Sequence, residues 1–333
     1  MERRTWLRLA AGAPLATALS TSLLSAQAQG QALPQPRGWP QRNVRLIAPF
    51  AAGSTSDTSA RFIAQHLGSA LGHPVVVDNM PGADGRLGMM AAKNAPTDGH
   101  TLVLGSWTNL AVNAVLIKDL PYDPLVDFKP VAGIGRSMLG IAVSGQSDLR
   151  TLADLVAAAR QRPRQLNFGN FATGYRLATE WFAGLAGIQF THVPYRSTSQ
   201  MNTDLAGRQI DVAMDGVTSM TPMLKSGQLR MLAVTGEQRH AEFPDVPTLK
   251  ETYPEYAIYG WSAVMVRSEV SDEITQFLAQ EMERVLGSPD GREFSRRAGS
   301  ELLHRRTDAM RQYQMAQIDT LRRVAQAAGL KPE

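Results

Sequence analysis

The sequence has no cysteine among its 333 residues. This absence excludes a disulfide scaffold, a cysteine nucleophile, an iron–sulfur cluster and a zinc site with thiolate ligands. It also suits an oxidising compartment, where a free thiol can mispair. A content of 44% hydrophobic and 19% charged residues is typical of a globular protein. At about 150 residues per domain, the chain is long enough for two domains.

The common catalytic motifs are absent as well. The sequence contains no G-x-S-x-G elbow, no P-loop and no H-E-x-x-H. Gly133-x-Gly135 and Gly82-x-x-Gly85-x-x-Gly88 do not have the spacing and context of a dinucleotide site, so we interpret them as turn or packing glycines. The histidines show no metal-ligand spacing: His66, His73, His100, His192, His240 and His304. We therefore expect no cofactor, no metal and no enzymatic activity, with an exported α/β hydrolase built from scattered residues as the alternative.

The basic character of the chain is concentrated at its amino terminus. Residues 1–28 contain three arginines, an apolar stretch from Leu9 to Leu24 and the small-x-small pattern Ala26-Gln27-Ala28, which together are typical of a cleaved export signal. Its removal lowers the net charge from +4 to +2. Arg3 and Arg4 fit both a twin-arginine and an ordinary secretory signal. We expect a soluble, monomeric periplasmic protein that binds no nucleic acid, because no Lys/Arg cluster with interleaved aromatics follows.

Short apolar runs alternate with helical patterns along the rest of the chain. Val44–Phe50 is predicted to be a buried strand, and the next apolar residues have the spacing of one helix face: Ala60, Ile63, Ala64, Leu67 and Leu71. The pattern restarts after residue 151, and Val131–Val143 is an apolar, glycine-punctuated candidate crossover between the two parts. Continuous apolar strands favour parallel sheets covered on both faces. The sequence predicts two α/β domains joined by two or more strands, which form a hinge.

A polar loop follows the first predicted strand. Gly53, Ser54, Thr55 and Ser56 precede a helix that begins near Asp57. Unpaired N–H groups at a helix N-terminus suit an anion, and hydroxyls add neutral donors. Simple N-capping by Ser56 or Asp57 explains the same residues. Asp57 also fits an acceptor for a ligand ammonium.

Two later strand ends carry similar loops. The candidate residues there are Ser106, Trp107 and Thr108, and Asn170, Phe171, Ala172 and Thr173. Ligands of open α/β sheets bind at the C-terminal ends of the strands, so the three loops together predict an anion clamp.

The chain resembles the substrate-binding proteins of tripartite tricarboxylate transporters, the Bug family of solute receptors. The resemblance spans essentially the whole chain after the signal and rests on the order and spacing of these motifs: Pro49-Phe50 with Gly53 and Asp57, Asn79-x-Pro81-Gly82-Ala83-x-Gly85-x-x-Gly88, Asp98-Gly99-x-Thr101-Leu102, Leu120-Pro121-Tyr122-Asp123-Pro124-x-x-Asp127-Phe128, Val193-Pro194-Tyr195, Gly207-x-x-Ile210-Asp211 and Pro244-Asp245-Val246-Pro247-Thr248.

The resemblance implies a two-lobed periplasmic binding protein of type II-like α/β fold. Each lobe is expected to be a mostly parallel sheet flanked by helices, and a small carboxylate is held in the interlobe cleft for delivery to membrane permease subunits. The expected division is a signal at 1–28, a first lobe at 29–137 and 241–333, and a second lobe at 138–240. A receptor that presents its ligand to a sensor protein fits the same features.

Two departures from the family pattern affect the site. Ser54 replaces the second glycine of the first loop, so a β-carbon and a hydroxyl enter the carboxylate cradle. In the second lobe, Arg176 stands near the place of the usual histidine, and we expect Arg176 or Tyr175 to supply part of the ligand contact. An arginine solvated on the first helical turn is the alternative.

Two further residues complete the candidate site. Tyr195 follows a predicted strand, and Asp215 ends another. Each fits either a cleft wall or a structural role. Phe171, Tyr175 and Trp107 favour a ligand with an apolar or aromatic part. The identity of the carboxylate stays open at this point.

Overall fold

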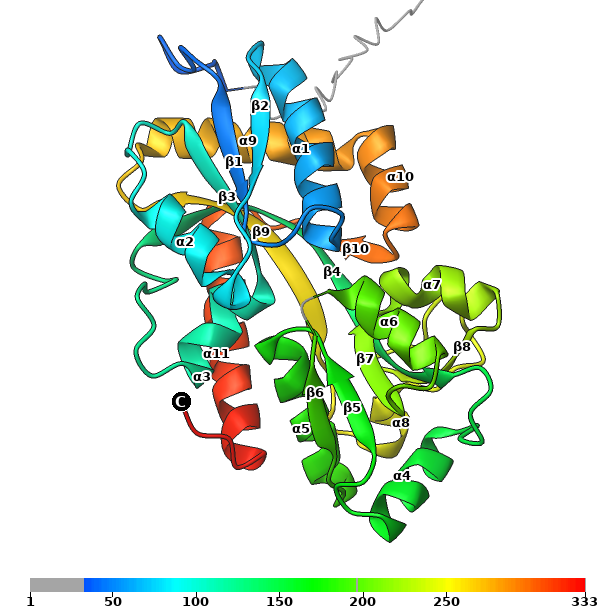
Figure 1. Ribbon diagram of the computed structural model, residues 1–333. Coiled ribbons are helices and arrows are strands. Elements are labelled where there is room, and N and C mark those ends of the chain that lie inside the picture. Colours follow the sequence, from blue (N-terminus) through cyan, green and yellow to red (C-terminus); the bar gives the residue numbers. More distant parts are fainter. Residues whose placement is uncertain (1–32, 196, 333) are drawn as a thin grey trace, which may run out of the picture. The chain divides into compact units, whose positions relative to one another are not determined.

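The computed structural model describes residues 33–332 apart from residue 196, so the predicted export signal lies outside the described residues. Ten strands form one continuous mixed sheet in the order β2-β1-β3-β9-β4-β7-β5-β6, with β10 and β8 also paired to β4 (Figure 1). The strands are β1 Val44–Ala48, β2 Val75–Asn79, β3 Thr101–Ser106, β4 Phe128–Ser144, β5 Asn167–Asn170, β6 Thr191–Pro194, β7 Val212–Gly216, β8 Leu229–Val234, β9 Tyr259–Arg267 and β10 Ser300–Leu302.

The long strand β4 joins two halves of this sheet. Its residues Phe128–Met138 pair with β9 and β10, whereas Leu139–Ser144 pair with β7 and β8. We call the strands on either side the first half (β1, β2, β3, β9, β10) and the second half (β5 to β8). The predicted crossover at Val131–Val143 lies within β4, which confirms it.

The mixed α/β architecture is confirmed, but parallel pairing is confined to the outer strands. β1 pairs in parallel with β2 and β3, and β5 pairs in parallel with β6 and β7. Every pair that involves β4 or β9 is antiparallel. The reason is connectivity: β4 carries the chain toward the second half, and β9 runs beside it in the opposite direction.

Helices cover both faces of each half (Figure 1). They are α1 Thr55–Leu71, α2 Arg86–Lys93, α3 Asn113–Leu116, α4 Leu152–Gln161, α5 Thr173–Ala186, α6 Thr198–Ala206, α7 Val217–Lys225, α8 Leu249–Thr252, α9 Asp272–Gly287, α10 Pro289–Arg297 and α11 Thr307–Ala327, with a 3-10 turn at Ala83–Gly85 and a π-helical turn at Thr108–Val112.

The helix faces read from the sequence agree with the structure. The predicted inner face of α1 is buried, from Ala60 to Leu71, and Gly72 ends the helix in the left-handed region at φ 66°. On β1, Leu46 faces α1 and α9 while its neighbour Ile47 packs in a second cluster with α2 and α11. This alternation places apolar layers on both sides of the strand, as expected for a covered sheet.

The second cluster extends across both halves. It contains Met310 and Leu321 of α11 together with Leu177 and Phe182 of α5. Tyr256, which is fully buried, stacks on Trp181 with ring centroids 4.5 Å apart. The C-terminal helix therefore packs against the second half as well as the first. Among the helices of residues 33–332, none is both long and apolar enough to cross a membrane.

Candidate ligand-binding site

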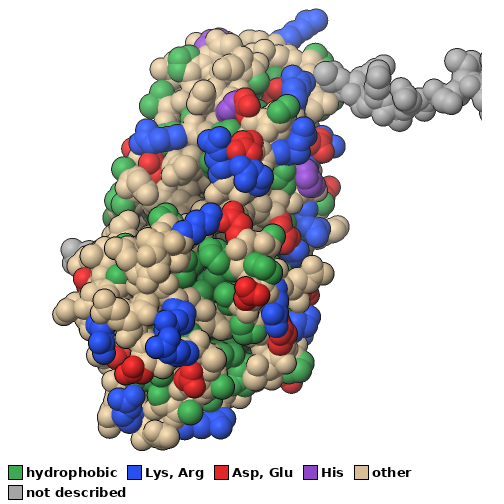
Figure 2. Space-filling view, turned by 90° about the vertical axis from the view of Figure 1, so that its right-hand side faces the viewer, with side chains coloured by type: hydrophobic (Ala, Val, Ile, Leu, Met, Phe, Trp, Pro, Cys, Tyr) green, Lys and Arg blue, Asp and Glu red, His purple; other side chains and the backbone are tan. Residues whose placement is uncertain are grey.

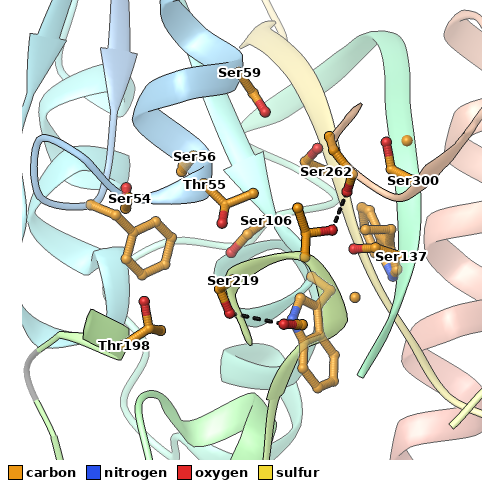
Figure 3. Close-up of a pocket in the computed structure, with 18 of the residues that line it drawn as sticks. Ser54, Thr55, Ser56, Ser59, Ser106, Ser137, Thr198, Ser219, Ser262 and Ser300 are labelled. Atoms are coloured by element: carbon orange, nitrogen blue, oxygen red, sulfur yellow. Dashed lines mark hydrogen bonds between the residues drawn. The ribbon is translucent and has the colours of Figure 1, made fainter. Parts of the chain in front are cut away.

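A cavity of about 150 Å³ lies between the two sheet halves. It is small beside the ~300–1,000 Å³ typical of sites for drug-sized ligands, so it suits a small metabolite. Figure 3 shows hydroxyl side chains around it, with Ser54, Thr55, Ser56 and Ser59 from the start of α1 on one side and Thr198 and Ser219 from the second half on the other.

Ten of the sixteen residues predicted for the site line this cavity. They are Ser54, Thr55, Ser56, Ser106, Trp107, Thr108, Phe171, Ala172, Tyr175 and Asp215. The structure thus brings the three predicted loops together, and the end of β7 joins them. The other six lie outside the lining: Gly53, Asp57, Asn170, Thr173, Arg176 and Tyr195.

The cap of α1 is Ser54, rather than Ser56 or Asp57. Its backbone is extended, and its hydroxyl accepts a hydrogen bond from the backbone N–H of Asp57 at 3.2 Å. Gly53 has φ 79°, a left-handed conformation that glycine adopts without strain. With Ser54 as the cap, the backbone N–H groups of Thr55 and Ser56 have no partner within the helix. These two groups belong to residues that line the cavity.

Asp57 serves the loop instead of the cavity. One oxygen of its carboxylate accepts from Gly53 N at 2.9 Å and Arg61 Nε at 3.0 Å, and the other accepts from Asn79 Nδ2 at 3.0 Å. Burial acts to raise the pKa of Asp57, but the hydrogen bonds from Arg61, Gly53 and Asn79 outweigh it and lower the pKa below its usual value. Of the two roles open to Asp57, helix capping or a contact with a ligand ammonium, capping belongs to Ser54, and the Asp57 carboxylate contacts Arg61.

The other residues outside the cavity also have structural partners or face solvent. Asn170 is buried and donates to Phe168 O at 3.0 Å, and Tyr195 donates its hydroxyl to Asp204 at 2.9 Å. Thr173 donates to Asp84, which lies in the first half of the molecule. Arg176 is exposed on the first turn of α5. Of the two side chains expected to replace part of the family's contact, the structure therefore places Tyr175 at the cavity and Arg176 away from it.

Asp215 brings a buried carboxylate to the wall formed by the second half. Its side chain is 2% exposed and accepts from Ser219 Oγ at 2.5 Å, Asn202 Nδ2 at 3.0 Å and Gly216 N at 2.8 Å. Burial raises its pKa to about 6, although these three hydrogen bonds act in the opposite direction. Burial, with a smaller effect from the Asp215 charge, also raises the pKa of Tyr175.

Four aromatic rings make a continuous wall between the halves. Phe50 lies 6.0 Å from Phe171, Phe171 lies 6.2 Å from Tyr175, and Tyr175 meets Trp107 edge-on at 5.8 Å between ring centroids. Phe50 and Trp107 follow strands of the first half, while Phe171 and Tyr175 belong to the second. All four residues line the cavity, so the rings contribute apolar surface to its wall.

The described lining of the cavity contains no positively charged side chain, since none of its residues is Lys, Arg or His. Figure 2 shows acidic and basic side chains interspersed over the face it presents. The described residues also contain no group of three or more His, Cys, Asp or Glu side chains suited to a metal ion. The polar groups that the lining offers to an anion are backbone N–H groups and hydroxyls.

Sequence reasoning missed several hydroxyls that face the cavity. They are Ser59, Ser137, Thr198, Thr218, Ser219, Ser262 and Ser300. Ser137 and Ser300 pair directly across β4 and β10, and Ser262 lies opposite Ser106 across β9 and β3. The only local signal for Ser262 was a hydroxyl within the apolar run of a predicted strand.

Comparison with known proteins agrees with this architecture. The profile of the family described as "Tripartite tricarboxylate transporter family receptor" matches residues 59–330. A UPF0065 protein of Bordetella bronchiseptica is 32% identical over 315 residues, which cover 94% of this chain and 91% of the relative.

Three solved structures have a similar fold. A Rhodopseudomonas palustris protein with adipate has a TM-score of 0.84 at 33% identity and covers 89% of this chain and 100% of its own. The periplasmic binding protein BugD has a TM-score of 0.82 at 25% identity, with 89% and 100% covered. MatC from Rhodopseudomonas palustris with bound malate has a TM-score of 0.80 at 26% identity, with 86% and 99% covered.

The family match covers most of the chain, and the fold matches that of the periplasmic receptors. The resemblance read from the sequence is therefore confirmed, as is the prediction of a non-enzymatic solute-binding protein. This chain belongs to the tripartite tricarboxylate transporter family of receptors.

Proposed function

We propose that this receptor binds a small organic carboxylate in the cavity between its two sheet halves and delivers it to the membrane permease of a tripartite transporter. The observation that carries the proposal is the start of α1, where Thr55 and Ser56, whose backbone N–H groups have no partner within the helix, line the cavity together with the capping Ser54. Hydrogen bonds to a carboxylate are roughly twice as strong as those between neutral groups. The presence of adipate and malate in two similar structures supports a carboxylate ligand.

The proposed delivery depends on closure of two lobes around the ligand. We assign residues 29–137 and 241–333 to the first lobe and residues 138–240 to the second, with the hinge around this boundary, where β4 changes partners between Met138 and Leu139. Ligand would bind to the first lobe at α1 and to the second near α5 and β7. Since only the closed form offers both sets of contacts, ligand shifts the population toward that form. The permease would then recognise the closed receptor.

This function requires the receptor to work outside the cytoplasm. We propose that residues 1–28 direct export to the periplasm and are removed after Ala28, by either the secretory or the twin-arginine route. Mass spectrometry of the exported protein, with Gln29 as the expected first residue, tests the cleavage site. A protein that keeps its amino-terminal methionine in the periplasm would contradict it.

A thermal-shift panel of carboxylates tests the binding step. A ligand that binds only the folded state raises its stability, by about 2.7 kcal/mol at a hundredfold excess over Kd. We expect at least one small carboxylate to raise the melting temperature, and the matching methyl ester or amide at that carboxylate to have no effect. Uptake of the same compound should be lost when the gene is deleted. A panel in which no carboxylate stabilises the protein would overturn the proposal.

A further inference from the structure

The two sides of the cavity present opposite electrostatic character to a ligand. On the first side, the start of α1 offers the N–H groups of Thr55 and Ser56 and neighbouring hydroxyls. On the other side, the end of β7 offers the carboxylate of Asp215, which is 2% exposed. An anionic group of a ligand is therefore stabilised at the α1 side and repelled at the Asp215 side.

The Asp215 carboxylate has no cationic partner in the described structure. The groups that bond to it are Asn202 on α6, Ser219 on α7 and the backbone N–H of Gly216, all neutral. The ionisable group that faces it from α5 is the Tyr175 hydroxyl, whose burial keeps it protonated. One oxygen accepts from Asn202 and Ser219, and the other accepts only from Gly216 among these contacts. A carboxylate oxygen has room for two bonds, so Oδ1 can accept one more donor.

Another carboxylate, that of Asp84, lies beside the N-terminus of the neighbouring helix α5 and accepts from the hydroxyl of Thr173. α5 begins after Ala172, which supplies no side-chain cap, and Thr173 is the first residue of that helix. Asp84 holds this position from a left-handed backbone at φ 53°, a conformation that costs energy for a residue other than glycine. The chain therefore places a carboxylate of its own beside the start of α5, which disfavours a second anion there.

We propose that the ligand carries one carboxylate, which binds at the start of α1, and a hydrogen-bond donor at its other end, which binds Asp215. Hydroxyl, amide N–H and ammonium groups are suitable donors. A second carboxylate at that end would face Asp215 with no cation to offset the repulsion. This inference rests on the proposed function, because it needs α1 to hold the first carboxylate.

A matched set of four-carbon acids tests the inference by titration calorimetry at pH 8. The probes are succinate, succinamate, 4-hydroxybutyrate and 4-aminobutyrate, which share one carboxylate and differ at the other end. We expect at least one of the three donor-bearing acids to bind ten times more tightly than succinate. Succinate binding as tightly as all three would overturn the inference while leaving a carboxylate receptor intact. If none of the four binds and the wider carboxylate panel also fails, the proposed function falls with it.

Asp215→Asn provides the second measurement. The amide keeps the size of the side chain and removes its charge, so affinity for the preferred donor-bearing acid should fall at least tenfold while affinity for succinate rises. Asp319→Asn is the matched control, because Asp319 lies exposed on α11 and pairs with Arg322 at 3.0 Å. It should leave both affinities unchanged. Equal changes in both affinities for Asp215→Asn would contradict the inference, and the preference of the unmodified protein decides the matter if the variant does not fold.

Discussion

Asp57 and Asp215 occupy similar positions in the two halves and behave in opposite ways. Each lies where a strand passes into a helix, β1 into α1 and β7 into α7, and each is almost fully buried, at 4% and 2% exposure. Arg61 pairs with Asp57, whose pKa is lowered, whereas Asp215 has only neutral partners and a pKa raised to about 6. Asp57 turns into its own loop, but Asp215 faces the cavity. Because the two acids are almost equally buried, it is the charge of the neighbouring group that sets the direction of each pKa shift.

The largest loss of ligand affinity should come from a variant that has a carboxylate on both sides of the cavity. Ser56→Asp places a carboxylate at the α1 side of the cavity, where the ligand carboxylate is proposed to bind. We expect carboxylate affinity to fall more than a hundredfold by calorimetry, with little loss of stability because an acidic residue suits the first turn of a helix. Thr58→Asp adds the same charge one half-turn on, at an exposed position outside the lining. It should cost less than tenfold; equal losses would show that overall charge matters more than position.

A ligand can contact both sides of the cavity only if α5 stays close to the first half. A β-carbon at Gly174 would lie 2.7 Å from Trp107 Cζ2 and 2.9 Å from Thr108 Oγ1. Gly174→Ala should therefore push α5 away from the first half and cost about 1–3 kcal/mol of stability, with a loss of ligand affinity. Gly184→Ala, on the same helix with no atom within 4 Å of the new carbon, should instead stabilise the protein by about 0.5–1 kcal/mol. Urea unfolding measures both, and a stabilising Gly174→Ala would refute the close approach.

Removing the charge of each acid should change stability in opposite directions. At pH 7.5, Asp57→Asn should destabilise the protein by about 2 kcal/mol, since Gly53, Arg61 and Asn79 lose an ionised acceptor. Asp215→Asn should stabilise it by about 2 kcal/mol, because the buried charge that raises the pKa to about 6 is gone. Chemical unfolding of both variants measures the pair. If both substitutions changed the free energy of unfolding in the same direction, the proposed difference between the two acids would be wrong.

The pH dependence of these two effects should differ as well. Between about pH 6 and pH 4, folded Asp215 binds a proton that the unfolded chain does not, so the unmodified protein gains stability as the pH falls and the advantage of Asp215→Asn fades. The lowered pKa of Asp57 gives a contribution that is present above about pH 4 and is lost only below it. Unfolding at pH 7.5 and pH 5 separates the two. An advantage of Asp215→Asn that grows at pH 5 would contradict this assignment.

The smallest effect concerns the contact between Asp84 and Thr173. Asp84→Ala loses the hydrogen bond and keeps the left-handed backbone, so we expect a cost of about 1 kcal/mol. Asp84→Gly loses the same bond but relieves the backbone, and about 1 kcal/mol of that relief should offset the loss. Differential scanning calorimetry compares the two. Identical melting temperatures would show that Asp84 is not strained.

Local pattern sufficed for the fold and for one side of the cavity. The apolar run of β1, the small residues after it and the periodicity of α1 predicted a polar loop at a helix start, and that loop contains Ser54, Thr55 and Ser56. The loops after β3 and β5 followed from the same rule about strand ends. These features depend on residues that are close together in the sequence, so they can be predicted from local sequence patterns alone.

Several contacts of the site depend on partners that are distant in the sequence. Asn79 reaches Asp57 from 22 residues away, and Ser300 approaches Ser137 through the register of β10 on β4. Neither pairing has a local pattern. The exposed position of Arg176 could not be predicted either, since the first turn of a helix can point its side chains toward a cleft or toward solvent, and neighbouring elements decide which.

The order of strands also has a consequence for synthesis. β9 separates β3 from β4, so the first half cannot close its sheet until residues 259–267 exist, about 120 residues after β4 is complete. At roughly 5–20 residues per second, the ribosome needs on the order of 6–25 s for that stretch. Until then the edges of β3 and β4 have no partner. The first half of the sheet therefore cannot assemble fully until more than three-quarters of the chain has been made.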